Sequence, residues 1–402
     1  MTGPRAEFQQ HSLPMSETFL FERLKTVSWQ ARELPKPIAI DELPTPALIL
    51  DQAAMERNLE AMSRHVSAHH KGARPHAKTH KCVLIAQAQL RHGAVGICAA
   101  KVGEAAALIL GGVDRVLITS PVTSPGKVQV LAELAKRASE LLLVVDSSAG
   151  LELLCTYLPG DVRLGLVLDV DVEMGRTGAR DADVAKRIVE TARRDPRFWF
   201  AGVQHYAGHL QHIAGFDERK KRSLESWEKA LHFARAACDA LPPIVSGGGS
   251  GTYAIDVDVT AITDLQVGSY LFMDREYRDI ESAHAKVFNE FEVSLTVACT
   301  AISAPLASLG AVSVNGGFKA FASDSGVPVP YDGAPGKFRF AGDEHGVFRV
   351  GEGAACPALG SVLRFVVPHC DPTVNLHDWY WVLEPDGLIR SVWPITARGM
   401  TW

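Results

Sequence analysis

Short apolar runs alternate with amphipathic stretches of helical period from about residue 45 to residue 274. Runs such as LLLVVDS (141–147) and LGLVLDVDV (164–172) are apolar at successive positions, which is typical of parallel strands covered on both faces. The stretch VGEAAALILGG (102–112) ends in two glycines, a common signal for a helix C-terminus. Roughly eight such units, beginning with TPALILD (45–51) and ending with LQVGSYLFMD (265–274), predict an α/β protein with a (β/α)8 barrel.

An open, doubly wound sheet is the alternative architecture for this alternation. No GxGxxG motif follows the first apolar run, which counts against dinucleotide binding. After about residue 285 the helical period is lost, and alternating runs such as GSVLRFVVPHC (360–370) are separated by Gly, Pro and Asp. We therefore expect an N-terminal extension at 1–40, a barrel at 41–285 and an antiparallel β domain at 286–402.

The charge and the cysteines exclude several classes of protein. A formal net charge of -5 provides no basic field for nucleic acid, and no apolar run is long enough to span a bilayer. The N-terminal segment lacks the uninterrupted apolar stretch of a secretory signal. The seven cysteines are odd in number and scattered, which favours reduced thiols in the cytoplasm over a disulfide framework.

The segment RPHAKTHK (74–81) places Lys78 where the flanking pattern predicts the end of a barrel strand. The active sites of such barrels lie at the C-terminal ends of the strands. A partly desolvated lysine at that position has a lowered pKa and can form a Schiff base with pyridoxal phosphate (PLP). The alternative is a basic surface strand with solvated charges. His76 and His80, two residues away on either side, are expected to pack behind Lys78 or to assist it.

Three further segments follow predicted barrel strands. DVDVEMGRTG (169–178) places Arg176 between two glycines, and HYAGHLQH (205–212) supplies Tyr206 and three histidines. In SGGGSGT (246–252) several backbone N–H groups can surround one anion, and hydroxyl side chains add donors. Because late loops of barrels often hold phosphate, we interpret this segment as a phosphate-binding loop, with a flexible glycine-rich loop as the alternative.

In the predicted β domain, PHCDP (368–372) brings His369, Cys370 and Asp371 together. In an extended strand, residues i and i+2 share one side, so His369 and Asp371 could hold one cation while Cys370 points away. An imidazole with a carboxylate suits Mn2+ or Mg2+ better than a soft, thiophilic ion. The alternative is a surface turn in which Asp371 caps the chain before Pro372.

Taken in order, the motifs RPHAKTHK, MGRTG, SGGGSGTY, QVGSYLFMD, DEHG and HCDPTVNLHDWY resemble the D-threonine aldolase and D-serine dehydratase family, whose members are PLP enzymes built like alanine racemase. The resemblance covers roughly residues 40 to 400. It implies a PLP barrel followed by a β domain. It also implies a homodimer, because in such enzymes the β domain of one chain completes the barrel mouth of another.

The resemblance implies roles for residues around the cofactor. Lys78 matches the Schiff-base lysine, and Arg176 matches the arginine that hydrogen-bonds the phenolic oxygen of PLP. Tyr206 is expected to border the ring, and Gln266 stands where alanine racemase has an arginine facing the pyridine nitrogen. The residues that match the phosphate cradle are Ser246, Gly248, Gly249, Ser250, Gly268 and Ser269.

The metal pair also follows the resemblance. His369 and Asp371 match the ligands of the aldolase branch, whereas the dehydratase branch more often has a cysteine in the third position. The implied reaction is a retro-aldol cleavage of a β-hydroxy-D-amino acid to glycine and an aldehyde. The cation would stabilise the alkoxide, and a base would remove the β-hydroxyl proton. His212 is our candidate for the base, with His209 or a metal-bound water as alternatives.

Two other functions stay open. If the cation drew the hydroxyl away as a leaving group, the chain would be a D-serine or 3-hydroxy-D-aspartate dehydratase. A PLP-carrier protein without catalysis is the remote alternative, because such carriers stop after the barrel. A neutral partner such as Gln266 need not protonate the pyridine nitrogen, which argues against racemase activity.

Overall fold

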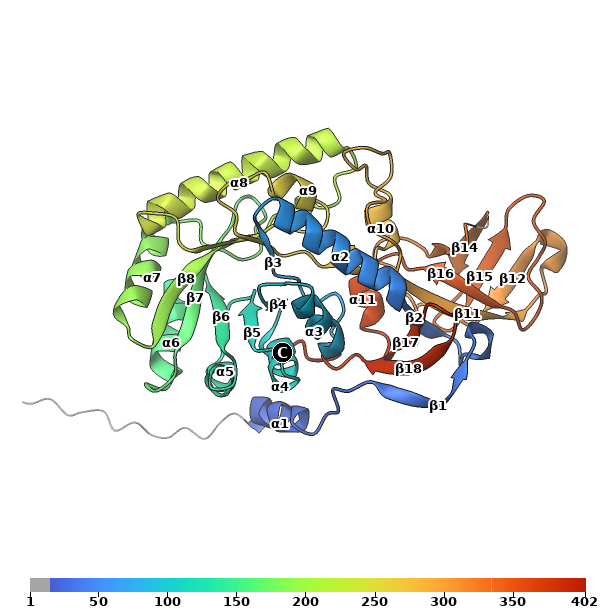
Figure 1. The fold of residues 1–402 in the computed structure, drawn as a ribbon, viewed down its shortest axis with the longest axis horizontal. Coiled ribbons are helices and arrows are strands. Elements are labelled where there is room, and N and C mark those ends of the chain that lie inside the picture. The colour runs from blue at the N-terminus through green and yellow to red at the C-terminus, as the bar shows by residue number, and fades with distance from the viewer. Residues whose placement is uncertain (1–14, 334) are drawn as a thin grey trace, which may run out of the picture.

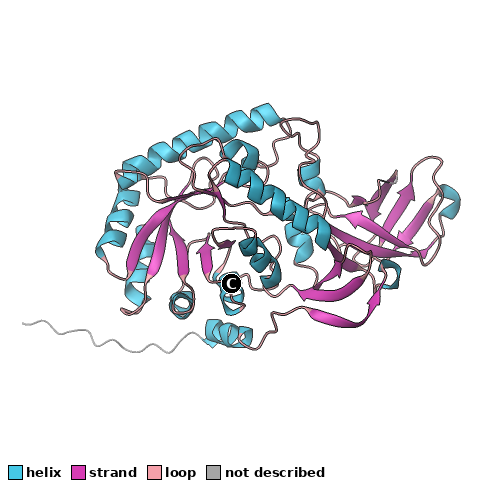
Figure 2. Cartoon of the chain, viewed as in Figure 1, coloured by secondary structure: helices cyan, strands magenta, loops and turns pink. Residues whose placement is uncertain are grey.

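Two units make up the fold in the computed structural model, which describes residues 15–333 and 335–402. A ring of strands with outer helices forms one side of the molecule, and a second, mainly antiparallel sheet forms the other (Figure 1). The helices lie on the outside of the ring and are almost absent from the second unit (Figure 2). Of the predicted extension at 1–40, residues 1–14 lie outside the described residues.

Eight parallel strands form the ring, in the order β3-β10-β9-β8-β7-β6-β5-β4. A bridge between His76 and Cys98 joins the two ends, so the predicted barrel is confirmed. Most positions of these strands are buried, which is why their sequences are largely continuous apolar runs. The strands are β3 (Gly72–Ala73), β4 (Ile97–Ala99), β5 (Arg115–Ile118), β6 (Glu140–Val145), β7 (Leu164–Val170), β8 (Phe198–His205), β9 (Ile244–Gly247) and β10 (Asp264–Leu265).

The helices that follow these strands bury their apolar faces against the ring. In α7 the side chain of Asp181 caps the N-terminus by accepting from the backbone N–H groups of Asp183 and Val184. The longest helix, α8, runs across the top of the barrel in Figure 1. The helices of this unit are α2 (Gln52–Ala68), which precedes β3, and α3 (Val83–Arg91), α4 (Val102–Leu110), α5 (Pro125–Ala135), α6 (Ser148–Tyr157), α7 (Ala182–Arg194), α8 (Phe216–Cys238), α9 (Tyr253–Asp256) and α10 (Arg275–Arg278).

The β domain is built on a ten-stranded sheet. The turn at PDG (385–387) joins β17 and β18 in an antiparallel hairpin. The short helix α11 (Cys370–Val374) follows β16. The strands of this domain are β1 (Arg32–Ile38), β2 (Ala47–Asp51), β11 (Leu295–Ser303), β12 (Ala311–Val314), β13 (Val329–Pro330), β14 (Gly336–Phe340), β15 (Gly346–Val350), β16 (Val362–Val366), β17 (Trp379–Leu383) and β18 (Ile389–Pro394).

The run TPALILD, expected as the first barrel strand, belongs to this second sheet instead. Its strand β2 pairs antiparallel with β11 and parallel with β17. The strand is buried on both faces, so its sequence has the same continuous apolar character as a barrel strand. Strand β1 pairs with β18, so residues 32–51 belong to the sheet of the β domain. Because β2 and β17 run parallel, this sheet is mixed rather than purely antiparallel as we had expected.

The described part of the N-terminal extension also packs on the body of the molecule. Helix α1 (Met15–Leu24) lies beneath α4 and α5 (Figure 1). Phe21 and Leu24 are buried in the main hydrophobic core. Among the helices of the described residues, none combines the length and apolar character that crossing a membrane requires.

Candidate active site

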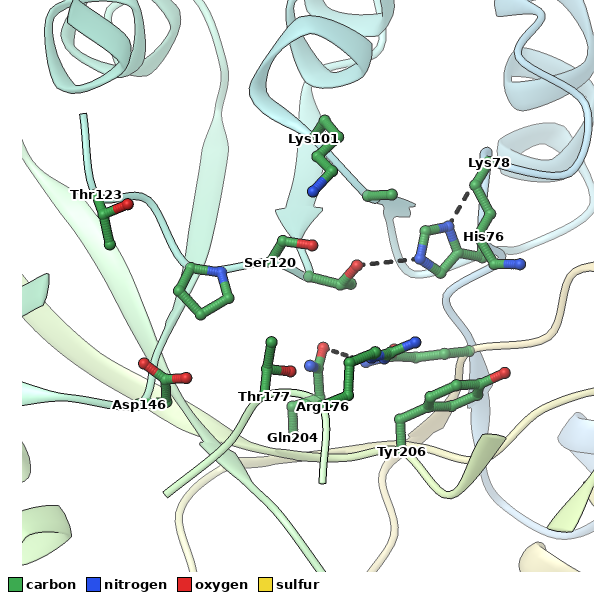
Figure 3. A pocket seen from close by; sticks show the side chains of 14 residues that line it. His76, Lys78, Lys101, Ser120, Thr123, Asp146, Arg176, Thr177, Gln204 and Tyr206 are labelled. Atoms are coloured by element: carbon green, nitrogen blue, oxygen red, sulfur yellow. Dashed lines mark hydrogen bonds between the residues drawn. The ribbon is translucent and has the colours of Figure 1, made fainter. Parts of the chain in front are cut away.

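A cavity of about 560 Å³ opens at the C-terminal ends of the barrel strands. This is a usual size for a small-molecule site. Figure 3 shows side chains from several strand ends pointing into it. Four predicted site residues line it: Lys78, Arg176, Tyr206 and Gln266. Further lining side chains that our sequence analysis missed are Lys101, Ser120, Thr123, Asp146, Thr177 and Gln204.

Lys78 lies in a turn rather than in a strand. Strand β3 ends at Ala73, and residues 77–80 form the turn. His76 supports this turn, because its Nδ1 accepts the backbone N–H of Lys78 at 3.3 Å while its Nε2 lies 3.0 Å from Thr119 Oγ1. Burial and the neighbouring Lys78 ammonium hold the pKa of His76 well below its usual range. His76 is therefore a neutral imidazole that positions the lysine.

The Lys78 ammonium forms an ion pair with the carboxylate of Asp371 in the same chain. Burial lowers the pKa of Lys78, but the Asp371 carboxylate and the Tyr206 hydroxyl outweigh this and raise it above the usual value. The same attraction outweighs burial for Asp371 and holds its pKa well below the usual range. The expectation of a lowered lysine pKa is therefore wrong for the chain without cofactor, because a carboxylate 293 residues away supplies the opposite charge.

Contacts from both units fix the turn that carries Lys78. The buried Lys81 ammonium pairs with Glu104 at the start of α4, whose other oxygen accepts the N–H of Ala100 at 2.8 Å. From β17, the Tyr380 hydroxyl donates to the carbonyl of His80 at 2.6 Å. Burial lowers the pKa of His80 to about 3, so its ring is neutral and packs behind the turn.

Arg176 and Tyr206 lie together on the wall of the cavity. The guanidinium of Arg176 stands 5.1 Å from the centre of the Tyr206 ring, a cation–π distance. Arg176 follows a tight turn in which Asp171 accepts the backbone N–H groups of Met174 and Gly175. The described residues place no carboxylate within ion-pair distance of Arg176, so its charge is available to a bound anion.

A hydrogen-bond network forms the floor of the cavity. Gln266 Nε2 donates to Gln204 Oε1 and to Ser246 Oγ, each at 3.0 Å. Gln204 in turn donates to Asp169 at 2.9 Å. The Ser246 hydroxyl donates to Asp264 at 2.6 Å and is fully buried, so Ser246 does not fit the phosphate-donor role that we expected. Its position in the interior of β9 turns it towards the floor.

The glycine-rich loop fits a phosphate through its backbone. Within the described residues, no hydrogen bond uses the backbone N–H groups of Gly248, Gly249, Ser250 or Ser269. Gly248 has φ +71°, and a Cβ at Gly268 would stand 2.5 Å from Thr79 Oγ1, so larger residues would close the space. The Ser250 hydroxyl accepts from the N–H groups of Gly268 and Tyr270 and thereby ties the two predicted parts of the cradle together.

His369 and Asp371 lie at the start of α11, where Asp371 contacts Lys78, and not in an extended strand. His369 is the N-cap of α11 and Asp371 lies in its first turn, so Cys370, which is fully buried, begins the helix. Asp324 lies 2.6 Å from His369 Nδ1, which leaves Nε2 for a ligand. Burial lowers the pKa of His369, but Asp371 and Asp324 outweigh it and raise the pKa.

The described residues contain no cluster of three metal-ligating side chains. The two ligands that we expected from the sequence are His369, whose Nε2 is left for a ligand, and Asp371, whose carboxylate pairs with Lys78 in this structure. Two donors suit a hard ion that keeps water or substrate in its other positions. Glu276 stands beside this pair, with one oxygen 4.0 Å from His369 Nδ1 and the other 3.6 Å from His212 Nδ1.

The candidate base His212 lies beside Glu276, whereas the alternative base, His209, does not. The His212 ring packs on Tyr277 at 4.5 Å, and burial lowers its pKa while Glu276 opposes that effect. His209 is exposed, as is His212, but it lies near Glu173, whose pKa it helps to lower. His205 is buried, with its Nε2 2.8 Å from Ser226 Oγ. Of the motif DEHG, residues 343–345 lie in the exposed turn between β14 and β15, Gly346 begins β15, and none of the four lines the cavity.

Comparison with known proteins agrees with this geometry. Residues 50–276 match the family model described as alanine racemase, N-terminal domain, and residues 294–383 match the putative serine dehydratase domain. The chain is 36% identical to a 3-hydroxy-D-aspartate aldolase of Paracoccus denitrificans (strain Pd 1222), over 89% of this chain and 93% of the relative. It is 37% identical to a D-threonine aldolase of Arthrobacter sp, with the same coverage.

This chain belongs to the D-threonine aldolase and D-serine dehydratase family. The dehydratases among the relatives are less similar, at 26% and 24% identity. The crystal structure of D-threonine aldolase from Filomicrobium marinum superposes with a TM-score of 0.87 at 33% identity, and the match covers 92% of this chain and 100% of that one. The alanine racemase-like fold that the resemblance implied is confirmed.

The family is one of PLP enzymes, and the residues of this chain fit that cofactor. The cavity offers a lysine amine, an arginine and an aromatic ring, and the glycine-rich loop after β9, which is not part of the cavity lining, offers free backbone N–H groups. All of them lie at the C-terminal ends of barrel strands, where loops carry ligand sites.

Proposed function

We propose that this chain is a PLP-dependent lyase that cleaves β-hydroxy-D-amino acids to glycine and an aldehyde. The observation that carries the proposal is the ion pair between Lys78, which lines the cavity, and Asp371, whose carboxylate also attracts His369. The residue that would anchor the cofactor thus contacts one of the two candidate cation ligands. The aldolases at 36% and 37% identity support this reaction over dehydration.

In this proposal each residue at the cavity has a definite task. Lys78 holds PLP, which when bound supplies the sink for the electrons of the breaking Cα–Cβ bond. The backbone N–H groups of 248–250 and Ser269 hold the phosphate. Arg176 and Tyr206 flank the ring, and Gln266 stands on the floor beneath it.

The remaining tasks concern the β-hydroxyl group of the substrate. His369 and Asp371 would hold a divalent cation, Mn2+ or Mg2+, which acidifies a bound hydroxyl. His212 removes the proton, because its lowered pKa keeps the ring neutral and able to accept. Glu276, 3.6 Å from His212 Nδ1, stabilises the imidazolium that results.

The test is incubation of the protein with PLP, Mn2+ and D-threonine. We expect glycine and acetaldehyde in equal amounts; 2-oxobutanoate with ammonia would make the chain a dehydratase instead. Lys78→Ala should lose both turnover and the absorbance of bound cofactor. Asp371→Ala should keep that absorbance and lose turnover, and full activity of this variant after chelation would overturn the metal assignment.

We also infer a homodimer in the cytoplasm. The dimer rests on the family resemblance, and the compartment is supported by seven free cysteines in the described residues. Light scattering coupled to gel filtration measures the mass directly: twice the chain mass of 43.5 kDa is expected, and a monomer would contradict it.

A further inference from the structure

Asp274 is a fully buried carboxylate that connects the starts of two short helices. It is the N-cap of α10, where its Oδ1 accepts the backbone N–H of Tyr277 at 3.1 Å. Its Oδ2 accepts the backbone N–H of Cys370, the first residue of α11, at 2.8 Å. Both helices lie where the barrel meets the β domain (Figure 1). One side chain thus satisfies a backbone donor at the start of each helix.

Backbone hydrogen bonds extend this junction between α10 and α11. The N–H of Arg275 donates to the carbonyl of Val367 at 3.0 Å. The N–H of Glu276 donates to the carbonyl of Pro368 at 3.2 Å. Together with the Asp274 carboxylate, these bonds hold the segment that opens α10 against the segment that leads into α11. The relative position of the two helices therefore depends on contacts that Asp274 completes.

The two helices carry different parts of the proposed machinery. On the α10 side, Glu276 Oε1 lies 3.6 Å from His212 Nδ1, and the Tyr277 ring packs on the His212 ring at 4.5 Å. On the α11 side, His369 is the N-cap and Asp371 lies in the first turn. The junction therefore fixes the candidate base relative to the candidate cation ligands.

We propose that Asp274 is a positioning residue that holds the base His212 at the working distance from His369 and Asp371. Asp274 does not line the cavity, so it acts through the two helices and not on the substrate. Displacement of a reacting group by about 1 Å can cost about a hundredfold in rate, so a loosened junction should reduce turnover. This inference rests on the proposed aldolase function, which supplies the roles of the groups that are positioned.

The first test measures the junction without cofactor, cation or substrate. Cys370 is fully buried at the start of α11, and Cys299 is fully buried in β11 of the same domain. In Asp274→Ala both helix starts lose their acceptor, so Cys370 should react with a maleimide about tenfold faster while Cys299 stays protected. Mass spectrometry of the two peptides measures both rates. Asp274→Asn keeps one acceptor oxygen and should show a smaller change in the same direction.

A matched variant and an internal reference separate local from global effects. Asp181→Ala removes the exposed N-cap side chain of α7, outside the cavity, and should leave the rate at Cys370 unchanged. Equal acceleration at Cys370 and Cys299 would mean that Asp274 serves the stability of the whole protein. No acceleration at Cys370 in either variant of Asp274 would mean that other contacts hold α11. Either result overturns the proposal.

The second test measures turnover of the holoenzyme with PLP, Mn2+ and D-threonine. We expect kcat per bound PLP to fall about tenfold to hundredfold in Asp274→Ala, with a smaller fall in Asp274→Asn. KM and the affinity for PLP, titrated by absorbance without substrate, should stay close to the wild-type values. Asp181→Ala should change none of these quantities. An unchanged kcat in Asp274→Ala, or weaker binding of PLP that accounts for the loss, would overturn the positioning role.

Failure of the proposed function can be separated from failure of this inference. If the wild-type holoenzyme cleaves no β-hydroxy-D-amino acid, the aldolase proposal fails. Selective exposure of Cys370 in the variants of Asp274 would then still show that this carboxylate sets the position of α11 against α10. Without that exposure, the inference fails even if the wild-type protein is an active aldolase.

Discussion

Lys78 and Asp371 illustrate how a single pair defines the site at the scale of residues. Without the carboxylate, burial would leave the lysine with a lowered pKa; with it, the ammonium is the stable form. The pair also brings the α11 turn to the barrel mouth, where His369 and His212 stand beside Glu276. The protonation state of the amine is therefore controlled by a residue of the β domain.

Replacing Asp371 by Asn should lower the pKa of Lys78, because the opposing effect of burial is then no longer outweighed. More of the amine is neutral at a given pH, so its reaction with an acylating reagent in the cofactor-free protein becomes faster. The pH dependence of that modification, followed by mass spectrometry of the Lys78 peptide, gives the pKa. An unchanged profile would show that Asp371 does not govern the amine.

A buried carboxylate beneath the glycine-rich loop gives a pH-dependent stability. Asp256 accepts from Ser223 Oγ at 2.7 Å and from Thr252, and burial raises its pKa from 3.8 to about 6. As the pH rises between these values the unfolded chain loses its proton first, so the folded state loses stability. From about pH 4.5 to pH 6 the loss is about 1.5 kcal/mol, and it is complete above the folded pKa.

Asp256→Asn has no carboxyl group to titrate, so its free energy of unfolding relative to wild type should rise by about 1.5 kcal/mol over that interval. Urea unfolding at both pH values measures the difference. Asp258→Asn, at an exposed position two residues along, is the control and should show no such trend. Parallel curves for Asp256→Asn and wild type would contradict the argument.

At the scale of elements, the site depends on how the turns after successive strands are joined. The turn of Lys78 after β3 and the start of α4 after β4 share Glu104. Both Lys81 and Glu104 are buried, so the pair is protected from solvent and needs both partners. The geometry of two neighbouring strand ends thus depends on one ion pair.

Glu104→Ala should lower the free energy of unfolding by about 3–5 kcal/mol, because the buried Lys81 ammonium is left uncompensated. Chemical denaturation measures the loss. Glu344→Ala removes a partner of Lys319 from an exposed pair and should cost less than about 1 kcal/mol. Similar losses in the free energy of unfolding for the two variants would show that burial does not increase the contribution of the Lys81–Glu104 pair to stability.

At the scale of the whole molecule, the barrel and the β domain are tied together by the chain itself. Strands β1 and β2 come before the barrel and pair with β18, β11 and β17, which come after it. Tyr380 on β17 reaches back to the carbonyl of His80 behind Lys78. The second sheet therefore acts as a support for the catalytic turn.

Tyr380→Phe should lower the free energy of unfolding by about 1–3 kcal/mol, since a buried carbonyl loses its donor. It should also speed the hydrogen exchange of the amides at 77–81, because the turn opens more easily. Tyr157→Phe, at an exposed ring, should change neither. If exchange at 77–81 stays the same, the support comes from other contacts.

The sequence by itself determined the barrel, the loss of helical periodicity near residue 285 and the positions of residues that follow strands. Continuous apolar runs mark parallel strands because both faces are buried, and strand ends mark the site because all eight meet at one rim. The same rule could have found Lys101, Ser120 and Asp146, each directly after a barrel strand.

Only the tertiary structure decided what depends on distant partners. TPALILD has the pattern of a barrel strand, and its pairing with β11 and β17 is fixed by packing that no local pattern contains. The helix at Cys370, the carboxylates beside His369 and the charge state of Lys78 likewise depend on contacts far along the chain. Local sequence patterns indicate which positions are buried and which period they follow. The charge states of residues and the pairing of strands depend instead on which distant segments come together in space.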